Sequence, residues 1–395
     1  MSPSTTKLGS CPGHRRVRRL LILFSDTGGG HRSAASAVAE ALQDLYGETA
    51  QIAFIDPLAE YAPWPLDQLG NIYTYMVRLK GKPWAIAWHL SNGQRRVMVL
   101  NKGWWLLARA MFLELLRDHT ADVVVCCHPL FNAPILRGLD NINAHTPLVT
   151  LMTDLIAGHP FWFEPGGSRY LVPTEGARRG ALACGLPAER IQVTGLPVNP
   201  RFAAITRKNP LAVRRRLGLE PDLPVVLLVG GAEGMGPFYR LCKTVAASGV
   251  QAQLVMIAGR NEQLQARLTA TTWALPVQVK GFVQNMHEWM RAADLLVTKA
   301  GPSTISEALV MGLPIVLSGA LPGQERPNVE YVVQAGAGVW APTPRRAAVA
   351  VRNLLSPDNL SLAQMAVHAK ALGQPDAARR VAEIVWGVAN KASTR

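Results

Sequence analysis

Residues 20–32 read Leu-Leu-Ile-Leu-Phe-Ser-Asp-Thr-Gly-Gly-Gly-His-Arg and indicate the architecture of the chain. The apolar run 20–24 predicts a buried strand, and the small residues of 33–45 predict the helix after it. A strand joined to a helix by a glycine-rich loop is typical of parallel α/β proteins. Such sheets bind ligands beyond the carboxyl ends of their strands, so this loop is a candidate site.

The loop brings polar groups to the start of the predicted helix. Gly29 and Gly30 allow the backbone to approach a ligand, and the helix start offers free N–H groups. His31 would face the ligand there, and an imidazole with a pKa near neutrality takes protons from hydroxyl groups. Asp26 is close enough in sequence to orient His31 or to replace it as the base. A tight turn capped by His31 is the alternative, and the lack of a following Lys-Ser or Lys-Thr disfavours a P-loop.

Apolar runs alternate with helical patterns in two series along the chain. We therefore predict an α/β protein of two Rossmann-like domains facing across a cleft. The expected divisions are a basic, disordered tail (1–19), an N-terminal domain (20–200), a C-terminal domain (201–365) and a C-terminal helix (366–395). This helix either crosses back to the N-terminal domain or stays with the C-terminal one. Strands are expected at 20–24, 52–55, 123–127, 148–152, 169–172 and 191–193, and then at 225–229, 253–257, 277–279, 295–297 and 315–317.

The segment 298–307, Thr-Lys-Ala-Gly-Pro-Ser-Thr-Ile-Ser-Glu, carries the most specific site pattern. Pro302 suits the first turn of a helix, Ser303 and Thr304 are able to cap it, and the free amides there can take a phosphate. Glu307 lies about one turn into that helix, where a carboxylate accepts two hydrogen bonds from a ribose diol. A surface carboxylate favoured by the helix dipole is the alternative for Glu307.

Two more loops belong to the second series. Gly230 and Gly231 follow a predicted strand and would let a diphosphate approach the backbone, although loop flexibility alone also explains them. Their spacing does not match the dinucleotide fingerprint, which disfavours a nicotinamide enzyme. Gln324 and Glu325 offer amide and carboxylate groups that suit sugar hydroxyls, or they form a polar surface loop.

Composition excludes several classes of protein. The 395 residues include 41 Lys and Arg against 27 Asp and Glu, a formal charge of +14 that favours anionic partners. The five cysteines form no Cys-x-x-Cys pair, so neither a disulfide framework nor a Cys-bound metal is expected. No apolar stretch is long enough to span a bilayer. No nucleic-acid recognition motif accompanies the charge, and we expect no nucleic-acid partner.

The stretch 61–119 interrupts the alternation with tryptophans and basic residues. Trp104 and Trp105 lie in a helical pattern whose Lys102, Arg109 and Arg117 share one face. Indole and cationic groups together suit the headgroup region of an anionic membrane, and this places both tryptophans on a lipid side. A core helix with a solvated edge fits the pattern equally well.

Six motifs in order resemble the monogalactosyldiacylglycerol synthase and diacylglycerol glucosyltransferase family, glycosyltransferase family 28, related to the lipid II-forming N-acetylglucosaminyltransferase. The resemblance runs from about residue 20 to 336. The motifs are SDTGGGHR (25–32), MTDLIAGHPFWF (152–163), GLPVNPRF (195–202), GFVQNM (281–286), TKAGPSTISEA (298–308) and GQERPNVEYV (323–332). Ser303 replaces an expected Gly, and an inserted-looking Ala-Leu-Pro precedes Gly323, which leaves the placement of Gln324 open.

The resemblance implies a GT-B fold and an inverting, metal-independent transfer of a hexose from a UDP-sugar to diacylglycerol, without a cofactor. It implies peripheral binding to an anionic membrane at the cytoplasmic face, with galactose favoured over glucose. His31, with Asp26, would be the base. The donor side would comprise Gly230, Gly231, Val283, Met286, Gly301, Ser303, Thr304, Glu307, Gln324 and Glu325, and the acceptor side Gly29, Gly30, Asp154 and His159.

Three alternatives remain open on the sequence. Another lipid acceptor, such as a polyprenyl-linked one, would use the same fold. A UDP-sugar epimerase would also share the fold, but the Trp-rich basic stretch disfavours it. A non-catalytic lipid- or nucleic-acid-binding protein is disfavoured by the intact His31, Glu307 and Gln324.

Overall fold

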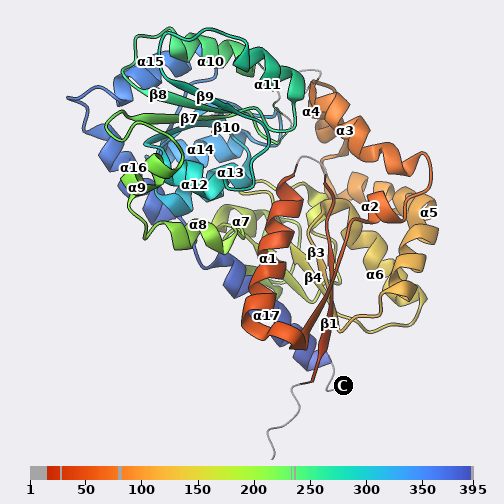
Figure 1. Ribbon diagram of the computed structural model, residues 1–395. Helices are drawn as coiled ribbons and strands as arrows, with labels where there is room; N and C mark the ends of the chain where they lie inside the picture. Colours follow the sequence, from red (N-terminus) through yellow and green to blue (C-terminus); the bar gives the residue numbers. More distant parts are fainter. Residues whose placement is uncertain (1–15, 27–28, 79–81, 233, 235–236, 393–395) are drawn as a thin grey trace, which may run out of the picture.

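The computed structural model describes residues 16–26, 29–78, 82–232, 234 and 237–392. The chain forms two parallel six-stranded sheets, one in each domain, with helices packed on their faces (Figure 1). The strand order is β2-β1-β3-β4-β5-β6 in the first sheet and β12-β11-β10-β7-β8-β9 in the second. The predicted α/β architecture of two Rossmann-like domains is confirmed.

The N-terminal domain is built around β1, which lies between β2 and β3 and is buried from Leu20 to Leu23. Its strands are β1 (Arg18–Leu23), β2 (Ala50–Ile55), β3 (Val123–Cys126), β4 (Leu148–Leu151), β5 (Arg169–Val172) and β6 (Ile191–Val193). Its helices are α1 (Gly30–Tyr46), α2 (Pro57–Glu60), α3 (Leu69–Arg78), α4 (Lys82–Ser91), α5 (Gln94–Asp118), α6 (Asn132–Asn141) and α7 (Glu175–Ala183).

The C-terminal domain repeats the plan. Its strands are β7 (Val225–Val229), β8 (Gln253–Ile257), β9 (Val277–Lys280), β10 (Leu295–Lys299), β11 (Ile315–Gly319) and β12 (Gly338–Trp340). Its helices are α10 (Phe238–Ala246), α11 (Glu262–Thr269), α12 (Met286–Ala292), α13 (Pro302–Met311), α14 (Arg326–Gln334), α15 (Pro344–Leu354) and α16 (Ser361–Leu372).

The strands expected from the apolar runs are all present, and the short edge strand β12 is one more. Arg18 and Arg19, which we assigned to the basic tail, pair with β2 in the first sheet, and residues 1–15 of that tail lie outside the described residues. The linker near residue 200 is helical, with α8 (Pro200–Ile205) and α9 (Pro210–Arg216). In α9, buried Arg214 forms an ion pair of 2.6 Å with Asp294, which ties the linker to the start of β10.

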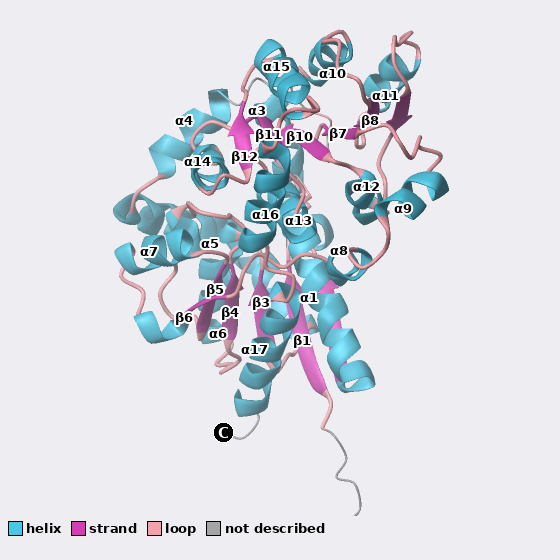
Figure 2. Cartoon of the chain, turned by 90° about the vertical axis from the view of Figure 1, so that its left-hand side faces the viewer, coloured by secondary structure: helices cyan, strands magenta, loops and turns pink. Residues whose placement is uncertain are grey.

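The end of the chain returns to the first domain. Helix α16 packs on α13 of the C-terminal domain, and α17 (Ala377–Ala392) packs on α1 (Figures 1 and 2). Val381 and Val385 of α17 are fully buried in the core of the first sheet, and the Trp386 ring stacks on Tyr46 at 4.0 Å. The last helix therefore completes the N-terminal domain and fastens the two domains together.

Replacing Val381 by Asp should destabilise the N-terminal domain by about 3 kcal/mol or more, because it buries an unpaired carboxylate in that core. Thermal unfolding followed by circular dichroism measures the change. Glu383→Ala, on the exposed side of α17, is the matched control and should stay within about 0.5 kcal/mol of the parent. Equal stability of the Val381→Asp protein and the parent would contradict the role of α17.

Candidate active site

The two domains touch through their glycine-rich loops at the carboxyl ends of the sheets. Gly29 precedes α1 with a φ of 79°, in the left-handed region that favours glycine. A Cβ on Gly29 would lie 3.3 Å from Cβ of Ala232, and one on Gly30 would lie 3.2 Å from Oγ of Ser303. The start of α1 thus faces both the loop after β7 and the start of α13.

His31 is fixed by a hydroxyl group. Its Nδ1 lies 2.6 Å from Oγ1 of Thr153, just beyond β4, and its ring meets the His128 ring edge-on at 4.7 Å. Burial lowers the pKa of His31 to about 4, against the opposing effect of a hydrogen bond with the Cys127 carbonyl. The imidazole is therefore neutral at pH 7 and has a lone pair that can accept a proton, but its pKa is lower than the near-neutral value that we expected, which makes it a weaker base.

Asp26 does not orient His31, contrary to one of our two expectations for it. Its Oδ2 lies 3.2 Å from Arg32 and 3.6 Å from Arg260 of the other domain. Thr153 takes the orienting position instead. This contact could not be predicted, because 122 residues separate the partners and only the order of strands brings them together.

A cavity of about 250 Å³ opens beside His31. Helices α3 and α4 form one wall, and the loops after β3 and β4 form the other, so the Trp-rich stretch supplies much of the lining. Its lining residues are His31, Leu58, Leu69, Ile72, Tyr73, Met76, Trp84, Ala87, Trp88, Ser91, His128, Pro129, Leu130, Asp154, His159, Phe161 and Gln324. The lining in the described part of the chain is mainly apolar and holds no Lys or Arg.

Asp154 and His159 both lie in the cavity wall, on the side where we expected the acceptor. Asp154 accepts hydrogen bonds from Nε1 of Trp162 at 2.6 Å and, across the cleft, from Nε2 of Gln324 at 2.8 Å. Burial raises the pKa of Asp154. His159 bonds through Nε2 to the Ser91 hydroxyl at 3.0 Å, and burial lowers its pKa to about 4. The wall thus carries little positive charge at neutral pH.

The start of α13 forms the other side of the cleft. Gly301 is the N-cap residue and Pro302 takes the first turn, as expected. The expected capping by Ser303 and Thr304 is wrong in detail, because both lie inside the helix and no side chain caps it. The first N–H groups of α13 consequently lack acceptors within the helix, which is the arrangement that binds anions.

Lys299 is a donor-side residue that our motif analysis did not single out. It lies between the two glycine loops, since its Cε would be 3.5 Å from a Cβ on Gly231 and its Nζ 3.2 Å from one on Gly301. Its Nζ lies 2.5 Å from Oε1 of Glu325. Glu325 is buried, and its Oε2 accepts from the Leu321 amide at 2.8 Å, so both of its oxygens are engaged.

Glu307 is half-buried within α13. No hydrogen bond or ion pair joins its carboxyl to another described residue, and burial raises its pKa to about 8. Val283 lies in the loop between β9 and α12, and Met286 begins α12; both are partly buried against the C-terminal core. Gly230 lies where β7 ends, as expected.

Helix α5 presents an apolar and basic outer face. Trp104 and Trp105 pack partly buried against the core, and Nε1 of Trp104 donates to the Leu130 carbonyl at 2.9 Å. The exposed apolar side chains are others, among them Val99 at 70%, Leu106 at 68% and Leu107 at 70% exposure. Exposed Arg95, Arg96, Lys102 and Arg109 accompany them. No helix of the described segments is long and apolar enough to cross a membrane.

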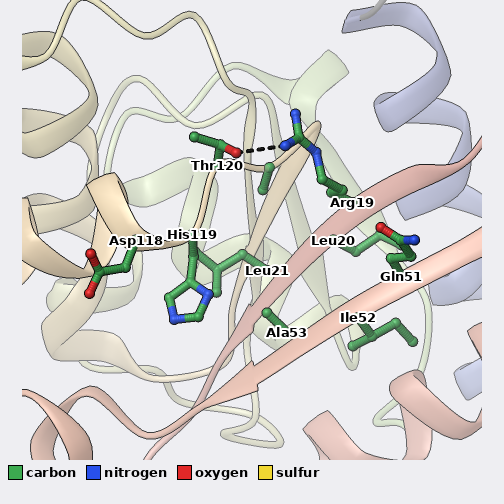
Figure 3. A pocket seen from close by; sticks show the side chains of 10 residues that line it. Arg19, Leu20, Leu21, Gln51, Ile52, Ala53, Asp118, His119 and Thr120 are labelled. Atoms are coloured by element: carbon green, nitrogen blue, oxygen red, sulfur yellow. Dashed lines mark hydrogen bonds between the residues drawn. The ribbon is translucent and has the colours of Figure 1, made fainter.

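Two observations concern other sites. Within the described residues, no group of three or more His, Cys, Asp or Glu side chains could hold a metal ion. A hollow of about 330 Å³ lies at the opposite, amino end of β1, where Arg19 donates to Oγ1 of Thr120 at 2.7 Å (Figure 3). It is remote from both glycine loops and contains none of the expected site residues.

The fold is shared with known sugar-nucleotide proteins. MurG of Acinetobacter baumannii matches with a TM-score of 0.60 at 17% identity, over 94% of this chain and 99% of MurG. HepE of Anabaena, in complex with UDP-glucose, matches with a TM-score of 0.57 at 16% identity, over 96% of this chain and 100% of HepE. These likenesses establish the GT-B fold of two facing domains.

The sequence relatives are closer. Residues 31–198 match the family model described as monogalactosyldiacylglycerol (MGDG) synthase, and residues 225–381 match the glycosyltransferase family 28 C-terminal domain. Monogalactosyldiacylglycerol synthase 3, chloroplastic, of Arabidopsis thaliana is 37% identical over 379 residues, covering 92% of this chain and 80% of the relative. The chain belongs to the monogalactosyldiacylglycerol synthase family.

Proposed function

We propose that this protein transfers galactose from UDP-galactose to the free hydroxyl of diacylglycerol. The observation that carries the proposal is the apolar cavity with the neutral imidazole of His31 in its wall. A diacylglycerol has a hydroxyl group on an otherwise apolar body, and the cavity matches this chemistry. Family membership supports galactose as the sugar.

The reaction is a single displacement. His31 accepts the proton of the acceptor hydroxyl while its oxygen forms a bond to the anomeric carbon. The bond from that carbon to the diphosphate oxygen breaks, and its electron pair leaves with UDP. The start of α13 and the ammonium group of Lys299 lie where they would stabilise the charge that develops on the diphosphate. We propose that these fixed groups suffice without a metal ion or a cofactor.

The charge of the cavity favours diacylglycerol over a polyprenyl diphosphate acceptor. A diphosphate would need cations, whereas the described lining has no Lys or Arg and its histidines have lowered pKa values. An epimerase acts on the UDP-sugar alone and would not need an apolar cavity beside the sugar. On the donor side, Glu307 would bind the ribose diol and Gln324 the sugar, while Glu325 acts by holding Lys299 in place.

Purified protein with diacylglycerol in mixed micelles and UDP-galactose should form galactosyldiacylglycerol. The reaction contains EDTA to remove metal ions, and a parallel reaction contains UDP-glucose in place of UDP-galactose. Mass spectrometry of the lipid identifies the product.

His31→Ala should lower turnover by about two to four orders of magnitude and leave UDP affinity unchanged, because only proton transfer is lost. A product that requires an added divalent metal would refute the metal-independent step, and near-normal turnover of His31→Ala would move the base to Asp26.

The affinity for UDP-galactose should rise as pH increases through about 8, because the ionised Glu307 accepts ribose hydrogen bonds better than the protonated form. Below pH 8 the binding should release a proton, which calorimetry in buffers of different ionisation enthalpy detects. Glu307→Gln should weaken binding and flatten the pH dependence. A parent protein whose affinity does not change between pH 6.5 and 9 would remove Glu307 from the ribose site.

The outer face of α4 and α5 is proposed to lie on an anionic membrane. Exposed Leu106 and Leu107 would enter the headgroup region, and the neighbouring Arg95, Arg96, Lys102 and Arg109 would contact anionic lipid. The acceptor cavity is lined by α3 and α4, next to this face, so the lipid would enter directly from the bilayer. The cytoplasmic side of the membrane remains a prediction.

Replacing Leu106 and Leu107 together by Ser should reduce co-sedimentation with vesicles of phosphatidylglycerol and phosphatidylcholine about 10-fold, since two apolar anchors are lost. Turnover with a diacylglycerol dispersed in detergent should be retained. Val367→Ser, an exposed apolar residue of α16 at the other domain, is the control and should bind vesicles as the parent does. Equal vesicle binding of all three proteins would refute this membrane face.

A further inference from the structure

Trp84, one of the residues that line the acceptor cavity, has a buried hydrogen-bond donor without an acceptor. Nε1 of Trp84, near the start of α4, is buried and finds no partner among the described residues. Trp84 lines the cavity beside apolar neighbours such as Leu69 and Met76. An indole N–H can only donate, and a buried donor without an acceptor is costly. The geometry therefore points to a ligand that brings an acceptor oxygen.

The indole ring of Trp84 is held on two sides. The Tyr73 ring of α3 meets it edge-on at 4.9 Å with an interplanar angle of 90°. The Trp88 ring, one turn further along α4, lies 6.0 Å away at an angle of 51°. The N–H group cannot turn out to solvent without breaking these contacts, so its direction is fixed before any lipid enters.

The cavity consequently makes three demands on the acceptor. His31 requires a hydroxyl group that can give up its proton, and Trp84 requires an oxygen that accepts a hydrogen bond. The remaining lining requires an apolar body. Diacylglycerol meets all three demands, because an ester carbonyl stands a few bonds from its free hydroxyl. A dialkyl glycerol ether has the hydroxyl and the apolar body but no carbonyl oxygen.

We propose that Trp84 is a specificity-determining residue that donates its Nε1–H to an ester carbonyl of the acceptor. The enzyme then prefers ester-linked over ether-linked diglycerides. The inference rests on the proposed function for its acceptor class. It names the ester carbonyl as a second group of the lipid that is recognised besides the hydroxyl group.

The test compares kcat/KM for a diacylglycerol and for the dialkylglycerol of equal chain length, both in the same mixed micelles with UDP-galactose. The parent should favour the diester by about 10-fold, the effect of one donor left unpaired in a dry site. Trp84→Phe should lose this preference, mainly through a slower reaction of the diester. Replacement of Trp84 by β-(3-benzothienyl)alanine keeps the ring shape and removes only the N–H, so it should have the same effect.

Trp88→Phe is the matched control. Trp88 lines the same cavity, but its Nε1 is not among the buried groups that lack a partner. The same loss of ring volume should therefore change the rates of diester and diether alike and preserve their ratio. Circular dichroism and UDP affinity check that each variant is folded.

Each outcome has one meaning. A diester preference that disappears in both Trp84 variants and persists in Trp88→Phe supports the proposal. A ratio that is the same in the parent and in the benzothienyl variant overturns it, while leaving galactosyl transfer intact. Absence of glycosylation of both lipids by the folded parent would instead refute the proposed function.

Discussion

The backbones of two glycine-rich loops meet where the two sheets face each other, and the site depends on this contact. A Cβ at Gly29 or Gly30 would press on Ala232 or Ser303 of the other domain, and these neighbours would have to shift by a few tenths of an ångström. Helices α1 and α13 both begin at the carboxyl end of a central strand, β1 or β10. The close contact brings His31 on α1 opposite the start of α13, where no side chain caps the first N–H groups.

Each side of this contact is held by its own supports. On the acceptor side, consecutive residues after β4 do separate tasks, since Thr153 fixes the His31 ring and Asp154 holds Gln324 of the other domain. On the donor side, Glu325 holds Lys299 between the glycine loops. The return of α17 to the first domain adds a covalent tie between the halves. The arrangement therefore fixes where acceptor and donor meet before either binds.

Much of the fold was predictable because buried parallel strands are continuous apolar runs and their glycine loops are short. Strand β12 was missed because Gly338–Trp340 contains no such run. The position of a candidate site residue was predictable where it depends on the first turns of one helix, as it does for His31 in α1 and Glu307 in α13. Contacts between residues far apart in the chain could not be predicted. Thr153 meets His31 only through the order of strands, and α3 and α4 form a cavity wall only because of how they pack. Lys299 was likewise not predicted, because its position depends on the ion pair with Glu325.

The central claim is that a hydroxyl held in the N-terminal cavity attacks directly a sugar held by the C-terminal domain. Proton NMR of the glycolipid made from UDP-α-galactose measures the configuration at the anomeric carbon. Direct attack from the face opposite the diphosphate predicts the β-anomer. An α-linked product would mean two successive displacements, and it would contradict the assignment of His31 as a base acting on the acceptor.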